Sequence, residues 1–221
     1  MTANKNLQAQ YESATEYDCL TREYGWHSPD ILFGLCFEYI RSGERLLDIG
    51  IGTGLSAFPF SKAGLEVSGL DLSQDILNLV RLKGITVNLK QFDIRNKPWP
   101  YPDGYFDHMV ACGVLHFLPD LAPIFLEASR VVRSGGIYAF TTKAPQHDTT
   151  PGFSKIYTER ICNVTVFLHN FACINALIEE SGFKKLKHIE YMDGVDESER
   201  RDPYYAWVIR RTDNTKNDNP I

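Results

Sequence analysis

Short apolar runs alternate with longer stretches in which apolar positions recur at helical spacing along most of the chain. Runs of the first kind, typical of buried strands, lie at 44–49, 65–71, 86–93, 105–115 and 137–142. Stretches of the second kind, typical of helices, lie at 30–43, 55–64, 75–84, 121–136 and 171–183. Strands that alternate with helices of this length predict crossover connections, and therefore an α/β fold with a mainly parallel sheet.

Cap and turn residues predict where several of these elements begin and end. Ser73 precedes a helical pattern and is expected to cap it, and Gly84 is expected to end it. Gly43 is expected to stop the first helix in the same way. The last two strand-like runs, 184–192 and 204–211, have no helix between them. They are therefore expected to pair antiparallel at one edge of the sheet.

The length and the pattern together predict a single domain over residues 11–211. The polar ends, 1–10 and 212–221, are expected to be mobile or disordered. The stretch 143–170 is longer than a simple connection between a strand and a helix. Long insertions in a compact domain are usually lids or binding loops, although a surface excursion without a role in binding is the alternative.

Composition and charge exclude several classes of protein. The chain is 43% hydrophobic with a net charge of −5, so electrostatics gives no reason to expect binding to a nucleic-acid backbone. No apolar run approaches the roughly 20 residues of a membrane span. The five cysteines show no C-x-x-C pair. This spacing favours reduced thiols in a cytoplasmic protein over a disulfide framework or a metal site.

The stretch LLDIGIGTG, residues 46–54, follows the first predicted strand directly. It lacks the G-x-G-x-x-G spacing of a dinucleotide site, and no G-K-[ST] follows as in a phosphate-binding P-loop. The carboxylate of Asp48 would repel a pyrophosphate but can accept hydrogen bonds from an ammonium group. The three glycines permit positive φ and close approach of a ligand. The loop therefore favours a nucleoside that carries an ammonium group, with a structural turn as the alternative.

This loop and the segments after it resemble the class I S-adenosylmethionine-dependent methyltransferases, in particular the type-11 and type-25 groups. The similarity spans roughly residues 44–142 and includes GLDLS, KQFDI, the stretch 100–120 and GGIYAFTT in the same order. It implies a Rossmann-like domain with a central seven-stranded, mostly parallel sheet, an antiparallel edge strand and helices on both faces. It also implies S-adenosylmethionine as cofactor and S-adenosylhomocysteine as product.

The resemblance further implies which residues bind the cofactor. Asp71 at the end of the second strand would accept both ribose hydroxyls, which is a charge-assisted contact. Asp93 would accept from the adenine amino group while Ile94 covers the ring. Helix capping and turn formation are the alternative roles of these two acids. The full set of expected cofactor contacts is Tyr24, Asp48, Gly50, Ile51, Gly52, Thr53, Gly54, Asp71, Leu72, Ser73, Asp93, Ile94, Cys112 and Gly113.

The acceptor side is less clearly marked. His116 is the candidate base or acceptor-orienting group, with packing as the alternative. The segment 11–29 is the candidate lid, because related methyltransferases cover the cofactor with such a segment; its aromatic rings could instead attach a helix to the core. The insertion 143–170 would supply an acceptor wall. The expected acceptor contacts are Trp26, His27, Val114, Leu115 and Tyr157.

The leading hypothesis is a methyltransferase that acts on a small-molecule acceptor, as a monomer or homodimer. The Pro-Cys and N-P-P-[YFW] motifs of nucleobase methyltransferases are missing, which argues against a nucleic-acid substrate. Two alternatives remain. One is a partner or sensor protein that binds S-adenosylmethionine without transferring its methyl group. The other is a nicotinamide-dependent oxidoreductase, which the acid at position 48 and Leu55 disfavour.

Overall fold

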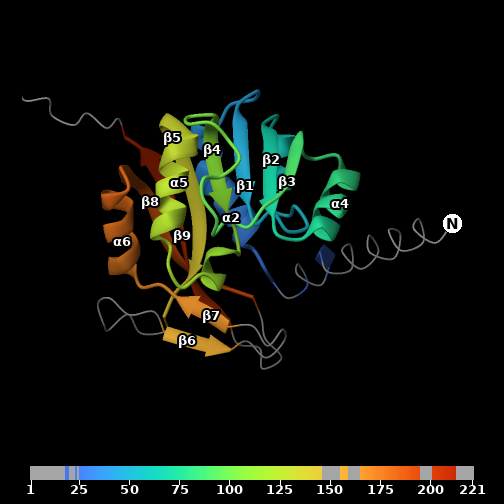
Figure 1. The fold of residues 1–221 in the computed structure, drawn as a ribbon. Coiled ribbons are helices and arrows are strands. Elements are labelled where there is room, and N and C mark those ends of the chain that lie inside the picture. The colour runs from blue at the N-terminus through green and yellow to red at the C-terminus, as the bar shows by residue number, and fades with distance from the viewer. Residues whose placement is uncertain are drawn as a thin grey trace, which may run out of the picture.

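The computed structural model describes residues 18–19, 23, 25–145, 155–158, 165–194 and 201–212. Seven strands form one central sheet (Figure 1). They are β1 (Arg45–Ile49), β2 (Glu66–Asp71), β3 (Asn88–Gln91), β4 (Phe106–Ala111), β5 (Val132–Lys143), β8 (Phe183–Asp193) and β9 (Asp202–Arg211). Their order across the sheet is β3-β2-β1-β4-β5-β9-β8.

The pairing confirms the predicted α/β fold. Strands β1 to β5 pair in parallel, with Leu46 of β1 opposite both Val67 of β2 and His108 of β4. Strand β9 runs antiparallel to β5 on one side and to β8 on the other, so the antiparallel strand lies one position in from the edge. The predicted antiparallel pairing of the last two strands is therefore confirmed.

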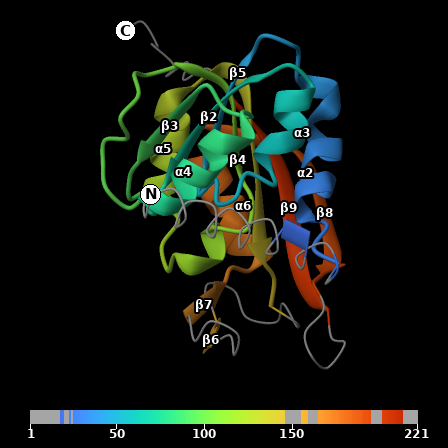
Figure 2. The ribbon, with the colours of Figure 1, turned by 90° about the vertical axis from the view of Figure 1, so that its right-hand side faces the viewer.

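Helices cover both faces of the sheet. They are α2 (Ser28–Cys36), α3 (Ala57–Lys62), α4 (Gln74–Lys83), α5 (Ala122–Val131) and α6 (Phe171–Glu180), with short 3-10 helices η1 (Phe37–Tyr39) and η2 (Leu115–Phe117). Buried residues of α5 and α6 pack on one face, and those of α2, α3 and α4 pack on the other. Figure 2 shows α2 and α3 on one side of the sheet and α5 on the other.

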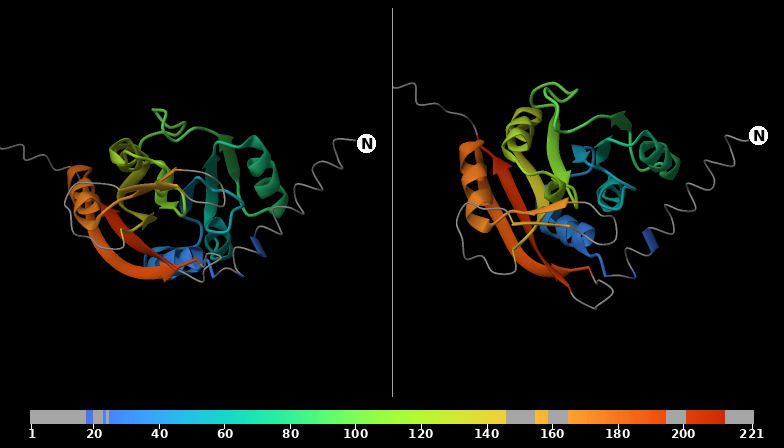
Figure 3. Two further views of the ribbon diagram at one scale, coloured as in Figure 1. Left: turned by 90° about the horizontal axis from the view of Figure 1, so that it is seen from below. Right: turned by 60° about the horizontal axis from the view of Figure 1, so that its bottom comes forward.

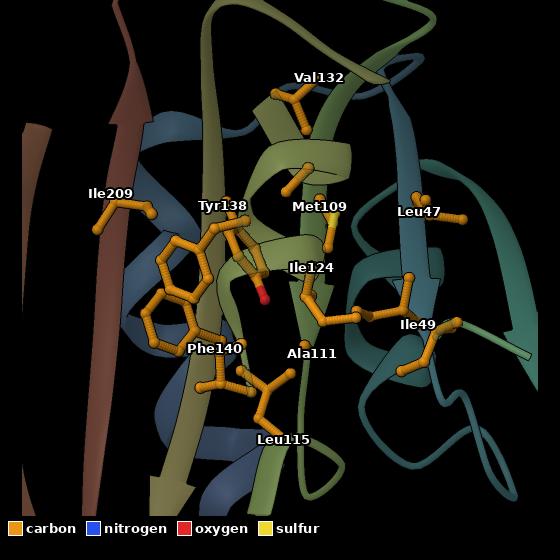
Figure 4. Packing of buried hydrophobic residues seen from close by; sticks show 14 of the residues in the cluster. Leu47, Ile49, Met109, Ala111, Leu115, Ile124, Val132, Tyr138, Phe140 and Ile209 are labelled. Atoms are coloured by element: carbon orange, nitrogen blue, oxygen red, sulfur yellow. The ribbon is translucent and has the colours of Figure 1, made fainter. Parts of the chain in front are cut away.

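The alternation of side chains along each strand divides the core into these two clusters. In β1, Leu47 and Ile49 join the cluster beneath α5, while Leu46 joins the cluster beneath α2. Figure 4 shows the first cluster, in which Leu47 and Ile49 lie across from Met109 of β4 and Phe140 of β5. Both faces of the central strands are covered, which explains why their sequences read as continuous apolar runs.

Several predicted element ends are close to those observed, but the helix expected to reach residue 136 ends at Val131, and β5 begins at the next residue. Ser73 caps α4 by accepting a hydrogen bond from Ile76 N, and Gly84 ends it in the left-handed region at φ 62°, as predicted. The first helix differs, because α2 ends at Cys36 and Gly43 lies beyond η1 in a turn at φ 85°. Pro29 in its first turn supports the earlier start, because proline needs no hydrogen-bond partner there.

The long insertion contains strands that the sequence pattern did not reveal. Strands β6 (Lys155–Thr158) and β7 (Thr165–Leu168) form a separate two-stranded antiparallel sheet. Strand β7 contacts η2 and β5. Figure 1 shows this small sheet below the main one.

The remaining expectations about the chain ends fall largely outside the described residues, which include neither 1–17 nor 213–221. Thr212 is the exception, because its N and Oγ1 both donate to Gly182 O. None of the helices that the structure describes is long and apolar enough to cross a lipid bilayer.

Candidate functional site

The candidate site lies at the carboxyl edge of the sheet, where β1, β2 and β4 end. Ligands of open α/β sheets bind at this edge, close to the point where the strand order reverses. The order shows that point between β1 and β4, since the chain proceeds from β1 towards β3 on one side and from β4 on the other. Figure 3 (left) looks onto this edge, with β6 and β7 in front.

The glycine loop has the backbone that its sequence predicts. Gly50, Gly52 and Gly54 have φ values of 64°, 52° and 84°, all in the left-handed region that favours glycine. A Cβ atom on Gly50 would lie 2.5 Å from Cγ2 of Val114, and one on Gly54 would lie 2.6 Å from Cδ1 of Ile85. The nearest atom to a Cβ on Gly52 is 3.9 Å away. The first and third glycines therefore permit close packing, whereas Gly52 faces space that a ligand can fill.

Asp48 is a buried acid beneath this loop. Its side chain is fully buried, and Oδ2 accepts a hydrogen bond from Ser56 Oγ at 2.6 Å. Oδ1 accepts no hydrogen bond from any residue that the structure describes. Burial raises the pKa of Asp48 to about 7, and the nearby Asp71 acts in the same direction. A buried carboxylate with an unsatisfied oxygen fits a cationic ligand group, which would stabilise its ionised form.

Asp71 ends β2 and connects the glycine loop to the start of α4. Oδ2 accepts from Gly52 N at 2.9 Å, and Oδ1 accepts from Ser73 N at 2.9 Å. These two contacts leave further acceptor positions on the carboxylate, because an ionised carboxylate has about four. The capping role and the ligand-binding role predicted for Asp71 are therefore compatible.

A pocket of about 330 Å³ opens next to Asp71. It is lined by Gly50, Asp71, Leu72, Phe92, Asp93, Ile94, Arg95, Val114, Phe117 and Leu118. Leu72 and Phe117 keep 62% and 43% of their surface exposed beside it, so apolar surface is available to a planar ligand. The structure thus brings together the acids predicted at the ends of β2 and β3.

Arg95 already pairs with the second of these acids. Its Nη2 lies 2.6 Å from Asp93 Oδ2, and its side chain is 66% exposed. Hydrogen bonds from the Arg95 side chain lower the pKa of Asp93, which is therefore ionised near neutral pH. The adenine contact expected of Asp93 stays a prediction, and it would use an acceptor position that Arg95 leaves open.

The loop after β4 forms another wall of the site. Gly113 has φ 73°, and its N donates to Thr141 Oγ1 at 3.0 Å. A Cβ on Gly113 would lie 3.2 Å from Cζ2 of Trp26, so the indole ring lies directly against this glycine. Burial, with Asp48 nearby, raises the pKa of the Cys112 thiol, which is therefore neutral and unsuited to act as a nucleophile.

The predicted acceptor-side residues are placed differently from one another. Val114 lines the pocket, whereas Leu115 is fully buried in the core cluster. His27 is exposed, and its backbone N donates to Asp193 Oδ1. Tyr157 belongs to β6, where its backbone pairs with Val166, and Tyr24 lies outside the described residues.

His116 is almost completely buried, at 5% exposure. Its Nδ1 has no hydrogen-bond partner among the described residues, and its ring centroid lies 4.4 Å from that of Phe117. Burial, with further effects of Lys143 and His169, lowers the pKa of His116 to about 3. Such an imidazole is neutral at physiological pH and is a weak proton acceptor. Catalysis by His116 stays a prediction that its environment does not favour.

Some pocket residues were not expected from the sequence, namely Phe92, Arg95, Phe117 and Leu118. Phe92 and Arg95 directly flank Asp93 and Ile94, so proximity to that pair could have indicated them. Phe117 and Leu118 follow His116 in the loop after β4, but a sequence pattern does not show which side chains of a loop turn inward. Within the described part of the chain, no three His, Cys, Asp or Glu side chains gather in a way that could hold a metal ion.

Comparison with known proteins agrees with this geometry. Residues 47–140 match the family described as a methyltransferase domain. A ubiquinone biosynthesis O-methyltransferase from Proteus mirabilis is 32% identical over 104 residues, which cover 45% of this chain and 42% of that protein. A phosphatidylethanolamine N-methyltransferase from Cereibacter sphaeroides is 33% identical over 137 residues, which cover 55% of this chain and 66% of that protein. The match thus spans less than half of the first relative.

Solved structures show the same fold. A SAM-dependent methyltransferase from Methanosarcina mazei superposes with a TM-score of 0.70 at 15% identity, covering 82% of this chain and 98% of that one. The [4+2]-cyclase SpnF superposes with a TM-score of 0.67 at 17% identity, covering 83% of this chain and 80% of that one. Residues 47–140 therefore match a methyltransferase domain, and the sheet order and the glycine loop agree with the fold of the S-adenosylmethionine-dependent methyltransferases.

Proposed function

We propose that this protein transfers the methyl group of S-adenosylmethionine to a small-molecule acceptor. The proposal is carried by the space over Gly52, by the buried carboxylate of Asp48 with its one unsatisfied oxygen, and by the pocket at Asp71. An adenosine group fits that pocket, and an ammonium group fits the carboxylate. The cofactor of this family carries both groups on one molecule.

When bound, S-adenosylmethionine supplies an electrophilic methyl carbon on a sulfonium. The protein's contribution would be to hold and orient it: Asp71 would accept from the ribose hydroxyls, Ile94 and Leu72 would flank the adenine ring, and Asp48 would bind the ammonium group. Alignment and exclusion of water can supply a large part of such an acceleration. Transfer to the acceptor's nucleophilic atom would leave S-adenosylhomocysteine, and any proton on that atom would pass to solvent.

Several features support a small acceptor. The net charge of −5 gives no attraction to a nucleic-acid backbone. Two of the relatives found by sequence are named for O-methylation in ubiquinone biosynthesis and for N-methylation of phosphatidylethanolamine, and neither name refers to a macromolecule. The neutral, buried His116 favours an acceptor that needs little help to lose a proton, such as a neutral amine or an acidic phenol. The free cysteines Cys19, Cys36, Cys112 and Cys173 support a reducing, cytoplasmic location. We expect a monomer or homodimer.

A second candidate is a protein that binds S-adenosylmethionine without transferring its methyl group. The low pKa of His116 favours it, because this neutral, buried imidazole is a weak proton acceptor. The likeness to a cyclase also means that this fold alone does not decide the reaction.

Thermal unfolding with S-adenosylmethionine, S-adenosylhomocysteine and NADH tests the cofactor first. A ligand at about 100 times its dissociation constant stabilises the folded state by about 2.7 kcal/mol, which corresponds to a shift of several degrees. We expect a shift with the first two compounds and none with NADH. A shift with NADH alone would revive the oxidoreductase and refute the proposal.

An acceptor panel then tests transfer, with production of S-adenosylhomocysteine as the readout. The panel contains phenols, hydroquinones, primary amines and ethanolamine phospholipids, and the Gly52→Val variant is the control that should not bind cofactor. Turnover by the wild type alone supports the methyltransferase. Tight cofactor binding without turnover on any class would favour the second candidate.

A further inference from the structure

The carboxylate of Asp193 makes three hydrogen bonds to the residues that begin α2. Asp193 ends β8 and is 1% exposed. Its Oδ1 accepts from His27 N at 2.7 Å, and its Oδ2 accepts from Ser28 N at 2.8 Å and from Ser28 Oγ at 2.5 Å. Ser28 Oγ also lies 2.5 Å from the hydroxyl of Tyr191 on the same strand. A strand near the C-terminus thus holds residues from 165 positions earlier in the chain.

These contacts replace a cap that the helix does not make for itself. His27 occupies the N-cap position of α2, and its side chain makes no capping hydrogen bond. The first amide groups of a helix have no partner within the helix, and the helix dipole favours a negative charge beside them. Asp193, on β8, provides both the hydrogen-bond acceptor and the negative charge at the start of α2. Gly194 N adds a hydrogen bond to Gly25 O, so the segment 25–28 is attached to the end of β8 at both of its ends.

The position of Trp26 depends on this attachment, because Trp26 lies inside the attached segment. One edge of the indole lies against Gly113, at 3.2 Å from the position of a Cβ atom there. Its ring also packs edge-on against Tyr204 of β9, with centroids 5.2 Å apart. Gly113 follows β4, the neighbour of β1, and the next residue, Val114, lies against Gly50 of the glycine loop. Trp26 therefore stands beside the space between the β1 and β4 loops.

We propose that Asp193 is a positioning residue, which sets the Trp26 ring against the methionine end of the cofactor. This inference rests on the proposed function, since the glycine loop and Gly113 must hold S-adenosylmethionine for it to apply. Asp193 touches neither the pocket nor the cofactor and acts through the backbone of residues 27 and 28. The pair β8–β9 then contributes to cofactor retention, although the ribose and adenine contacts are expected from β2 and β3.

The test uses the full chain labelled with 5-fluorotryptophan and observed by fluorine NMR. The protein has three tryptophans, Trp26, Trp99 and Trp207, and single replacements by phenylalanine assign their signals. Asp193→Asn keeps the shape of the side chain but replaces one acceptor oxygen by an NH₂ group. The matched control is Asp107→Asn. Asp107 of β4 also accepts a hydrogen bond from a backbone amide of another element, Arg45 N at 2.7 Å, but it lies near the amino-terminal ends of the parallel strands, away from Trp26.

In the wild type, we expect S-adenosylhomocysteine to move the Trp26 signal. Asp193→Asn should shift or broaden that signal before any ligand is added, and leave the Trp99 and Trp207 signals in place. It should also weaken binding of S-adenosylhomocysteine by about tenfold, because a displaced Trp26 ring no longer packs against the bound ligand. Asp107→Asn should change neither readout, although it also lowers stability. Should Asp193→Asn not fold, Ser28→Ala removes the hydroxyl contacts and should move the Trp26 signal in the same way.

The outcomes separate the two claims. An unchanged Trp26 signal and unchanged ligand affinity in Asp193→Asn would overturn the positioning role and leave the proposed function intact. Equal weakening in Asp193→Asn and Asp107→Asn would also overturn it, because the effect would then be one of general stability. No binding of S-adenosylhomocysteine by the wild type would refute the proposed function, and with it the cofactor part of this inference.

Discussion

The buried acid beneath the glycine loop gives a prediction that requires no knowledge of the acceptor. In the unfolded chain Asp48 ionises near its ordinary pKa of 3.8, whereas burial raises the pKa to about 7 in the folded protein. Between these values the folded state holds a proton that the unfolded state has released. The contribution of Asp48 to the free energy of unfolding is therefore greatest below about pH 4 and is lost as the pH rises to about 7. Above that pH, the free energy of unfolding no longer changes because of Asp48.

The size of the effect follows from the difference between the two pKa values. Each pKa unit corresponds to about 1.4 kcal/mol, so the full loss is about 4 kcal/mol. About 3 kcal/mol of it falls between pH 5 and pH 8, where unfolding by urea is easily measured. Asp48→Asn removes the titration but keeps a hydrogen-bond acceptor for Ser56 Oγ. We expect this variant to gain about 3 kcal/mol relative to the wild type across that range.

Glu127→Gln is the matched control for this measurement. Glu127 is also buried and accepts from Trp99 N at 2.7 Å; burial is the largest single influence on its pKa and raises it, but the hydrogen bonds from Arg130 and Trp99 N and the nearby positive charges together lower it. The ionised Glu127 carboxylate contributes to the free energy of unfolding throughout the range above about pH 5. The difference in that free energy between Glu127→Gln and the wild type should therefore be about the same at pH 5 and pH 8. A stability difference for Asp48→Asn that does not change with pH would refute the reasoning about Asp48.

The same carboxylate predicts a difference between ligands. S-adenosylhomocysteine carries an ammonium group, which favours ionised Asp48, whereas 5′-methylthioadenosine lacks the amino-acid part. Affinity for the first should rise from pH 6 to pH 8 in the wild type and rise less in Asp48→Asn. Affinity for 5′-methylthioadenosine should not rise with pH in either protein. Calorimetry of both ligands at pH 6 and pH 8 measures these affinities.

Three further substitutions test the remaining contacts. Asp71→Ala should weaken binding of S-adenosylhomocysteine by about 1.5–3 kcal/mol in calorimetry, as for charged hydrogen bonds, while Asp75→Ala, on the exposed first turn of α4, should not. Gly52→Val should abolish binding but still unfold cooperatively at a lowered Tm, because the new side chain fills the ligand space and strains a residue with positive φ. The imidazole of His116 should remain neutral from pH 8 to pH 5 in nitrogen NMR spectra, because burial lowers its pKa to about 3; protonation near pH 6.5 would contradict this. His116→Asn should leave affinity for S-adenosylhomocysteine unchanged, and any effect should appear in turnover.

The sequence predicted the fold, and the gathering of Asp71 and Asp93 at one pocket, for one physical reason. Parallel strands place their carboxyl ends at one edge of the sheet, so the acids at those ends, Asp48 in β1, Asp71 in β2 and Asp93 just after β3, had to lie near one another. Local rules also sufficed for Ser73 and Gly84, since a cap depends on a few neighbouring residues. The backbone of the glycine loop is also a local feature, because its positive φ values follow from three alternating glycines.

The acceptor half depends on contacts between distant parts of the chain, which a pattern does not contain. The burial of Leu115 depends on how η2 packs against the core cluster. The contact between Asp193 and Ser28 joins positions 165 residues apart. Strands β6 and β7 are only four residues each, which is too short to show a reliable alternation. The pairing of β6 with β7 depends on which residues face one another, and the composition of such short segments does not indicate this.

The place of β9 in the sheet has a consequence for how the protein is synthesised. Residues 137–143 of β5 pair with residues 204–210 of β9, and β9 comes after every other strand that the structure describes. Until the ribosome has released β9, the nascent chain exposes a long unpaired edge of β5 together with the apolar surface that Trp207 and Ile209 later cover. Pairing of sequence-distant strands is also slow, because the intervening chain must be ordered first. A chain truncated shortly before β9 would therefore be open to edge-to-edge aggregation along β5.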